Sequence, residues 1–153
     1  MKWKNPPIAK IYEALGSVAD GRVDVAGNTA RVYSSSRNKY YDITFDVSAK
    51  AIMSNDNGSY WQGYLGYPPI AFLMKIGMLS YDPAIGDLLK GVAWKDINQK
   101  FKNDFVKGLE YVLSSKTEDE RKRLDEFARK VHAEIKSLDL DMLGEKTVPP
   151  RGY

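Results

Sequence analysis

The stretch that decides the fold is residues 22–54, which read RVDVAGNTARVYSSSRNKYYDITFDVSAKAIMS. Residues 22–26 and 29–35 are rich in β-formers and flank the dipeptide Gly27-Asn28. Glycine at the first position of a two-residue loop is typical of a type II′ turn, whose twist matches that of paired antiparallel strands. This stretch therefore predicts a β-hairpin near the start of the chain.

The hairpin sets a register that can be read from the sequence. It places three pairs of residues opposite each other: Val25 with Ala30, Val23 with Val32, and Asp24 with Arg31. The first two pairs are apolar and share one face, whereas the third joins opposite charges on the other face. Cross-strand pairs of both kinds stabilise a sheet by about 0.2–1 kcal/mol each.

Two more strands follow the hairpin. Residues 39–46 alternate apolar and polar side chains, with Tyr41, Ile43 and Phe45 on one face. Residues 51–54 form a short fourth strand after a turn at residues 47–50. Alternation of this kind indicates an antiparallel sheet with one buried face. We therefore expect a meander of about four strands.

Helices are predicted before and after this meander along the chain. Asn5 is followed by two prolines and predicts a helix N-terminus, and Gly16 predicts its end. After the sheet, residues 70–76 predict a helix that Gly77 closes, and residues 83–90 predict another short one.

The last third of the chain predicts two longer helices. The first runs from residue 94 to residue 113 and carries an apolar stripe of Ile97, Phe101, Phe105, Leu109, Val112 and Leu113. The second starts at a capping box formed by Thr117 and Glu120, and its apolar face comprises Leu124, Phe127, Ala128, Val131, Ile135 and Leu138. Only residues 114–116 connect them, which favours an antiparallel helical hairpin. The expected class is α+β: one domain over residues 1–143, with helices packed on the meander, and a flexible tail over residues 144–153.

Composition excludes several kinds of chemistry. The 153 residues include no cysteine and a single histidine, His132. Disulfides, Cys-based zinc sites, iron–sulfur clusters and cysteine nucleophiles are therefore excluded, as is any two-histidine metal site within one chain. We accordingly expect no cofactor and no metal. The 23 basic and 20 acidic residues give a net charge of +3, which is small for a nucleic-acid-binding domain.

We expect no membrane-spanning or signal segment in this sequence. Its longest apolar run covers residues 70–74, whereas a span needs about 20 residues, and the N-terminus lacks a signal-peptide core. We therefore expect a cytoplasmic protein with no membrane partner. The sequence has two glutamines, no cysteine and more lysine than arginine. This composition resembles that of thermophilic proteins.

The most unusual segment is residues 60–67, YWQGYLGY, with four aromatic residues and two glycines. Glycine allows close approach of a ligand to the backbone, while Tyr and Trp offer flat faces with polar tips. Such a segment can stack bases or receive a partner protein, or it can simply fill the seam between sheet and helices. The candidate binding residues here are Tyr60, Trp61, Tyr64 and Tyr67.

A polar loop over residues 34–39 and the strand before it add positive charge beside this segment. Such groups contact phosphates in nucleic-acid complexes, although a plain exposed turn has the same composition. The candidate residues that we place next to the aromatic segment are Arg31, Tyr33, Arg37 and Lys39.

Carboxylates offer the one acid–base chemistry that needs neither cysteine nor histidine. Asp42 and Asp46 share one face of the third strand, and Asp56 follows the fourth. A solvent-facing strand shows the same pattern. Residues 55–58, NDNG, are similar to half a calcium loop, but the remaining ligands are missing and an Asx turn explains them. His132 lies beside the apolar stripe of the last helix, with no nucleophile near it in sequence.

Residues 29–76 resemble a SWIM-type zinc finger in the order of their elements. Residues 32–36, 40–43 and 51–54 resemble its strands, and residues 67–74 resemble the start of its helix. The four positions that would bind zinc carry other residues: Met53, Asn55, Tyr67 and Pro69. The resemblance implies a metal-free derivative in which packed aromatic side chains replace the zinc, and a role in binding DNA or protein.

Three classes of function remain open from the sequence. The first is a non-catalytic binding module for a protein or nucleic-acid partner, which uses residues 60–67 and the basic hairpin. The second is a small acid–base enzyme that uses Asp42, Asp46 or Asp56 and needs a cleft beside a carboxyl of perturbed pKa. The third is a structural protein or homo-oligomer, in which the aromatic segment or the helical hairpin is buried at a subunit contact.

Overall fold

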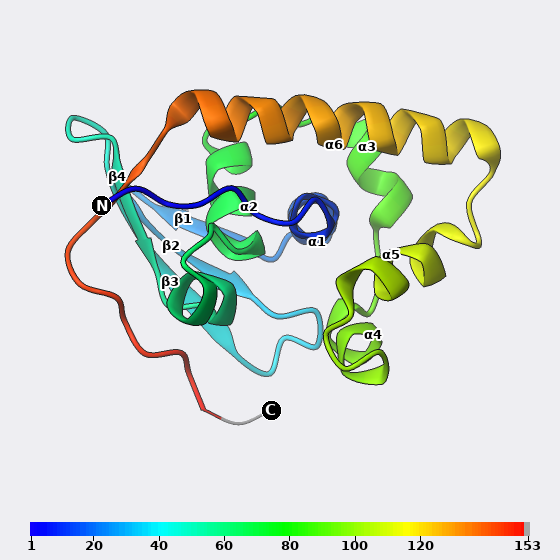
Figure 1. The fold of residues 1–153 in the computed structure, drawn as a ribbon, viewed down its shortest axis with the longest axis horizontal. Coiled ribbons are helices and arrows are strands. Elements are labelled where there is room, and N and C mark those ends of the chain that lie inside the picture. The colour runs from blue at the N-terminus through cyan, green and yellow to red at the C-terminus, as the bar shows by residue number, and fades with distance from the viewer. Residues whose placement is uncertain (152–153) are drawn as a thin grey trace.

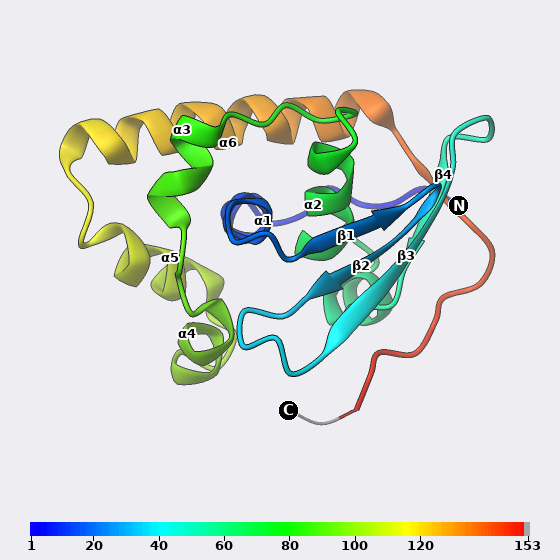
Figure 2. The ribbon, with the colours of Figure 1, turned by 180° about the vertical axis from the view of Figure 1, so that it is seen from behind.

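The computed structural model describes residues 1–151 and contains one sheet of five strands in chain order (Figures 1 and 2). The first four strands form the predicted antiparallel meander, and the fifth, which was not predicted, pairs parallel to the fourth. The strands are β1 (Val23–Ala26), β2 (Thr29–Tyr33), β3 (Tyr40–Asp46), β4 (Ala51–Ser54) and β5 (Asp141–Met142).

The register of the β1–β2 hairpin is the predicted one. Asp24 lies opposite Arg31, and the two apolar pairs are also as expected. Gly27 has a φ of +64°, which the first position of a type II′ turn requires. Val25 is 40% exposed, although it lies on the same face of β1 as the buried Val23.

The helices lie on one face of the sheet (Figure 1). They are α1 (Ala9–Ala19), the π-helical turn η1 (Gly58–Gln62), α2 (Tyr67–Lys75), α3 (Pro83–Gly86), the 3-10 turn η2 (Asp87–Leu89), α4 (Trp94–Lys100), α5 (Phe105–Leu113) and α6 (Glu118–Leu138). Helix α2 packs on the first four strands, and α1 packs on α2. Gly77 ends α2 with a φ of +83°, as the sequence predicts.

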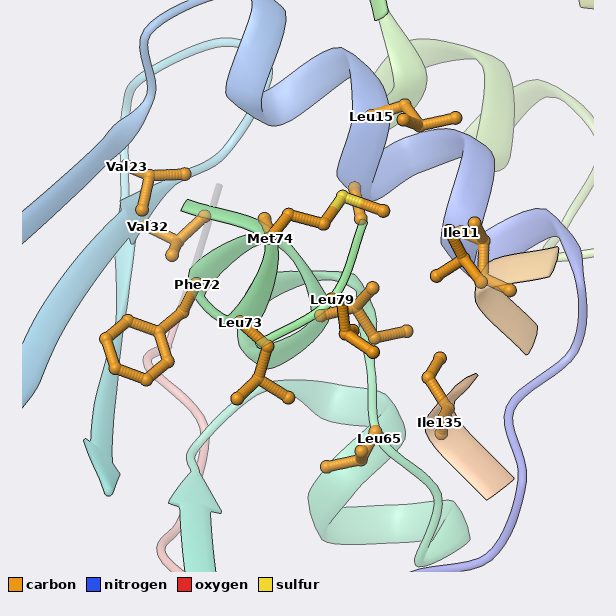
Figure 3. Packing of buried hydrophobic residues seen from close by; sticks show 14 of the residues in the cluster. Ile11, Leu15, Val23, Val32, Leu65, Phe72, Leu73, Met74, Leu79 and Ile135 are labelled. Atoms are coloured by element: carbon orange, nitrogen blue, oxygen red, sulfur yellow. The ribbon is translucent and has the colours of Figure 1, made fainter. Parts of the chain in front are cut away.

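The apolar core fills the space between the sheet, α2 and α1 (Figure 3). Phe72 of α2 meets Phe45 of β3 edge to face, with ring centroids 6.0 Å apart. On the α1 side, Ile11 and Leu15 are fully buried. Since each large apolar side chain that is buried contributes about 1.5–3 kcal/mol, this cluster supplies most of the driving force for folding.

Helix α1 differs from the prediction at both ends. Asn5 is exposed and does not cap it; the helix begins after Ile8. Gly16 lies inside the helix rather than at its end. A Cβ on Gly16 would lie 3.0 Å from Nε1 of Trp94 and 3.2 Å from the carbonyl oxygen of Leu89. This glycine therefore permits close packing of α1 on η2 and α4.

The long helix predicted over residues 94–113 is wrong, because the chain breaks in its middle. Lys102 and Asn103 adopt left-handed φ values of +51° and +63°, which interrupt the helical hydrogen-bond ladder. Asp104 then caps a new helix by accepting a hydrogen bond from the backbone N–H of Lys107 at 3.1 Å. The local Asx cap thus outweighs the apolar stripe that continues through the break.

The C-terminal helical hairpin is also wrong. Helix α6 begins at the predicted capping box of Thr117 and Glu120, and it spans the length of the molecule (Figure 1). It packs on α1 and α3, whereas α5 packs on α1 and α4. The break at residues 102–103 separates α4 from α5, and α5 packs on α1 and α4 rather than along α6.

The predicted boundary at residue 143 falls just after β5. Residues 144–151 contain neither helix nor strand, and residues 152–153 of the predicted flexible tail lie outside the described residues. Lys146 contacts the body of the protein, donating from Nζ to the carbonyl oxygen of Tyr60 at 3.2 Å. Within residues 1–151, no helix has the length and apolar character needed to cross a membrane.

Candidate functional site

A cleft of about 850 Å³ opens between α1, the loop of residues 34–39, η1 and α4. We call it the charged cleft. Five basic side chains line it against two acidic ones, together with several aromatic rings. The basic residues are Lys10, Arg22, Lys39, Lys95 and Lys102; the acidic ones are Glu13 and Asp56; the aromatic ones are Tyr41, Trp61, Tyr64, Tyr67, Trp94 and Phe105.

Four of these charged side chains are almost entirely buried. Lys10 is 9% exposed, Glu13 and Arg22 are 2% exposed, and Asp56 is 3% exposed. Charged residues are rarely buried to this degree unless they are paired, and burial of a charge costs free energy. Their concentration around one cleft is typical of a functional site.

Lys10 and Glu13 form a buried ion pair on one face of α1. Lys10 Nζ lies 3.0 Å from Glu13 Oε2 and 3.8 Å from the centre of the Phe105 ring. Asn98 of α4 donates from Nδ2 to the other oxygen of Glu13 at 2.5 Å. Glu13 Oε2 itself accepts no well-aligned hydrogen bond, so Lys10 balances its charge without filling its hydrogen-bonding capacity.

Arg22 connects the end of α1 to the second strand. Its Nη1 donates to the carbonyl oxygen of Tyr33 at 2.8 Å, and its Nε donates to Asp20 Oδ2 at 3.3 Å. Its Nη2 is buried and has no hydrogen-bond partner among residues 1–151. The guanidinium group is therefore held in place from two sides.

Asp56 lies in a polar cluster at the start of η1. Its Oδ1 accepts hydrogen bonds from the hydroxyls of Ser54 at 2.5 Å and Ser59 at 2.6 Å, and its Oδ2 accepts the backbone N–H of Ser59 at 3.1 Å. Burial raises the pKa of Asp56, although these hydrogen bonds oppose the rise. A Cβ on Gly66 would overlap Oδ2, so glycine is needed there.

The structure brings three of the four predicted aromatic residues to the charged cleft. Trp61 is 68% exposed, whereas Tyr64 and Tyr67 are partly buried. Burial raises the pKa of Tyr64 and raises that of Tyr67 well above its ordinary value. Tyr60 does not line the cleft; it packs edge to face on Trp61, with centroids 4.7 Å apart.

Of the predicted basic group, only Lys39 lines the charged cleft. Burial lowers the pKa of Lys39, and the nearby charge of Lys95 lowers it further. Arg37 donates to the carbonyl oxygen of Asp20 at 2.9 Å, outside the cleft.

Arg31 and Tyr33 are also not among the residues of the charged cleft. Arg31 lies 3.8 Å from Asp42 and 4.5 Å from the centre of the Tyr40 ring. Tyr33 contacts the same ring, with centroids 5.7 Å apart. Of the predicted hairpin residues, these two therefore contact Asp42 and Tyr40 of the neighbouring strand and do not line the cleft.

The sequence analysis missed Lys10, Glu13 and Arg22. Lys10 and Glu13 lie three residues apart in a helix whose other positions are mostly apolar. Two charged residues in such a helix could have indicated a buried ion pair. For Arg22 there was no signal, because an arginine at the start of a strand is ordinary.

Among the other candidates, Asp42 and Asp46 are exposed and lie outside the charged cleft. His132 Nε2 lies 3.0 Å from the carbonyl oxygen of Pro6, which is a structural contact between α6 and the N-terminal segment. Within residues 1–151, no group of three or more His, Cys, Asp or Glu side chains is arranged to hold a metal ion.

Comparison with known proteins gives no support to the SWIM-type resemblance. Met53 is a buried apolar residue of β4, and Pro69 lies in the first turn of α2. No curated protein and no solved structure matches the chain. One family model, described as Uncharacterised conserved protein UCP014422, matches residues 3–141. Because this match covers nearly the whole chain, the protein belongs to that family.

Proposed function

We propose that the protein is a binding module whose charged cleft takes a small organic anion with a flat ring. A nucleotide unit has this chemistry, either free or within single-stranded nucleic acid. The observation that carries the proposal is the excess of five basic over two acidic side chains in one cleft that also holds aromatic rings.

The two acidic side chains of the cleft already have partners. Glu13 is paired with Lys10, and Asp56 accepts three hydrogen bonds from two serines. Within the described residues, the lining of the cleft carries five basic side chains and these two acidic ones. An excess of basic over acidic side chains favours an anionic ligand.

The aromatic part of the ligand is matched by the rim of the charged cleft. Trp61 and Tyr64 both line the cleft, and 68% of the surface of Trp61 is exposed. Exposed Trp and Tyr rings stack on flat ligands with about 1–3 kcal/mol per base in nucleic-acid complexes. A ligand with both a ring and an anionic group would use both features.

Calorimetric titration tests this proposal. Adenosine 5′-monophosphate, adenosine and a six-nucleotide single strand would each be titrated at two salt concentrations. We expect the monophosphate to bind at least about tenfold more tightly than adenosine, and binding to weaken as salt rises. Tighter binding of the six-nucleotide strand would identify nucleic acid as the source of the ligand. The absence of binding by all three would overturn the proposal.

Variants locate the binding in the charged cleft. Trp61→Ala should weaken binding of the monophosphate about tenfold, as expected for loss of one stacking contact. Tyr111→Ala is the matched control, since Tyr111 is 48% exposed on α5 and outside the cleft. Equal affinities of the two variants would place the ligand elsewhere.

Asp56 favours a second candidate, an acid–base enzyme. It is the one acid of the three predicted candidates that lines the cleft, and burial raises its pKa, as a general acid requires. Turnover of a bound ligand, abolished in Asp56→Asn while binding is retained, would support this candidate. A ligand that binds and is recovered unchanged would support the binding module.

A further inference from the structure

Three buried side-chain atoms within residues 1–151 lack a hydrogen-bond partner, and all belong to residues that line the charged cleft. One of them, Trp94 Nε1, is packed against α1, where a Cβ on Gly16 would lie 3.0 Å away. The other two are an acceptor, Glu13 Oε2, and a donor, Arg22 Nη2. Buried polar atoms without hydrogen bonds are costly, so these two indicate a group that residues 1–151 do not supply.

Both atoms belong to side chains whose charge is already balanced. Lys10 Nζ lies 3.0 Å from Glu13 Oε2, and Asp20 Oδ2 lies 3.3 Å from Arg22 Nε. What remains unused is hydrogen-bonding capacity, since a carboxylate oxygen can accept more than one hydrogen bond and a guanidinium group has five N–H donors. A neutral group that carries one donor and one acceptor side by side would satisfy both atoms.

Hydrogen bonds place Glu13 and Arg22 on either side of Ser17. The Ser17 hydroxyl donates to the carbonyl oxygen of Glu13 at 3.0 Å, and the carbonyl oxygen of Ser17 accepts the backbone N–H of Arg22 at 3.0 Å. Both side chains line the charged cleft. The acceptor and the donor are therefore presented to the cleft from the same end of α1.

Tyr67 lies within electrostatic range of both side chains. Burial raises the pKa of Tyr67 well above its ordinary value; the charge of Arg22 opposes this rise and the charge of Glu13 adds to it. The ring is fixed edge to face against Tyr41, with centroids 6.2 Å apart. Within residues 1–151 the Tyr67 hydroxyl forms no hydrogen bond. A phenol can donate and accept, so this hydroxyl adds a third unused group to the cleft.

We propose that Glu13, Arg22 and Tyr67 bind the edge of a nitrogen heterocycle on which an amino group lies next to a ring nitrogen, as in adenine and cytosine. The inference rests on the proposed function, and it names the chemistry of the flat ring. Glu13 Oε2 accepts an N–H of the amino group, as carboxylates do from the amino group of cytosine. Arg22 Nη2 and the Tyr67 hydroxyl donate to the ring nitrogen.

The number of free acceptors selects the kind of edge. Asn98 Nδ2 donates to Glu13 Oε1 at 2.5 Å, so Glu13 offers one oxygen to a ligand rather than two. Guanine presents two neighbouring N–H groups on its pairing edge and would leave one of them without an acceptor. We therefore expect adenosine to bind more tightly than guanosine.

Two nucleosides test the proposed edge directly. Adenosine and purine riboside share the ring and the ribose, and they differ in the amino group alone. By calorimetric titration we expect adenosine to bind at least about tenfold more tightly, because a site built to bind an N–H group discriminates strongly against an analogue that lacks it. Equal affinities would overturn the proposal.

Glu13→Gln assigns the amino group to Glu13. Because Asn98 donates to Oε1, the amide nitrogen of glutamine takes the place of Oε2 and the acceptor is lost. Adenosine should bind about tenfold more weakly to this variant, whereas purine riboside should bind as it does to the wild type. Tyr111→Phe is the control, since Tyr111 is exposed on α5 and outside the cleft. An adenosine preference that survives in Glu13→Gln would overturn the assignment.

Tyr67→Phe removes a hydroxyl and keeps the ring that packs on Tyr41. It should weaken both nucleosides by a similar factor, because both carry the ring nitrogen. Thermal melting would establish that the variants are folded; if Glu13→Gln is not, Tyr67→Phe and the pair of nucleosides decide. Unchanged affinity of Tyr67→Phe for both nucleosides would overturn the site.

The two proposals fail in different ways. If adenosine binds more tightly than purine riboside but no more weakly than adenosine 5′-monophosphate, the edge stands and the anionic part of the proposed function is wrong. If the monophosphate binds more tightly than adenosine, while adenosine and purine riboside bind equally, the proposed function stands and the edge is wrong.

Discussion

Helix α1 has two buried sides of opposite chemistry. One side places Ile11 and Leu15 in the apolar core against α2. The other side places Lys10 and Glu13 in the charged cleft, where they are also less than a tenth exposed. Both sides of the helix are therefore buried, but the hydrophobic effect explains the burial of the apolar side only. The charged side costs free energy of desolvation, so its presence points to function rather than to stability.

The largest expected effect comes from the apolar side of this comparison. Phe72→Ala removes a fully buried ring that packs on Phe45 and should lower the free energy of unfolding by about 4 kcal/mol. Urea denaturation would measure the loss. Val106→Ala, at a position 68% exposed, is the control and should change the free energy by less than about 0.5 kcal/mol. Equal effects of the two variants would contradict the placement of the core.

The next effect distinguishes a functional ion pair from a stabilising one. Lys10→Met leaves the buried Glu13 carboxylate without its counter-ion and should cost about 3 kcal/mol. The double variant Lys10→Met/Glu13→Gln removes both charges and retains an acceptor for Asn98. Its stability should return to within about 1 kcal/mol of the wild type in urea denaturation. A double variant as unstable as the single one would show that the pair stabilises the fold.

The effect of Asp56 depends on pH. Burial raises its pKa in the folded state above the ordinary value of 3.8, so the folded protein binds this proton more tightly than the unfolded chain. Its contribution to stability is full below pH 3.8 and is lost as the pH rises through the folded-state pKa. Relative to Asp56→Asn, the wild type should therefore lose at most about 1.4 kcal/mol per pH unit over this range. Denaturation at several pH values would test this.

Asp42→Asn provides the matched control for the pH series, because Asp42 is exposed and lies outside the charged cleft. If the difference between Asp56→Asn and the wild type is as flat across the pH series as the difference between Asp42→Asn and the wild type, the buried carboxyl of Asp56 does not titrate in the direction that its burial predicts.

The smallest effect is expected at the rim of the cleft. Trp61→Ala should change the free energy of unfolding by less than about 0.5 kcal/mol, because the side chain is 68% exposed. Thermal melting would detect a larger change. A loss of several kcal/mol would mean that Trp61 is part of the core, and the contrast between a stabilising side and a binding side of the molecule would not hold.

The apolar side of this comparison could be predicted from the sequence. Residues 22–54 specified four strands, the Gly27-Asn28 turn specified the register of the first two, and the capping box specified where α6 begins. These are local signals, since each depends on residues near each other in the chain. The break at Lys102 and Asn103 was missed because the apolar stripe continues through it, and the hairpin expected from that stripe was wrong.

The charged side could be predicted only in part. The sequence analysis selected four residues that line the cleft, because they belong to an aromatic segment and a basic loop: Trp61, Tyr64, Tyr67 and Lys39. Lys10, Arg22 and Lys95 come from three different parts of the chain and acquire meaning only when the fold brings them together. Isolated lysines and arginines are ordinarily surface residues, so sequence patterns give no reason to select these three.

Strand β5 has a consequence for how the chain folds. All four residues of β4 are buried, and its outer edge is covered when Asp141 and Leu143 donate to the carbonyl oxygens of Lys50 and Ile52. Until that contact of long sequence separation forms, an apolar strand edge stays open to pairing with another chain. Contacts of this kind form slowly, so the period before β5 adds to the sheet is when this protein is most exposed to aggregation.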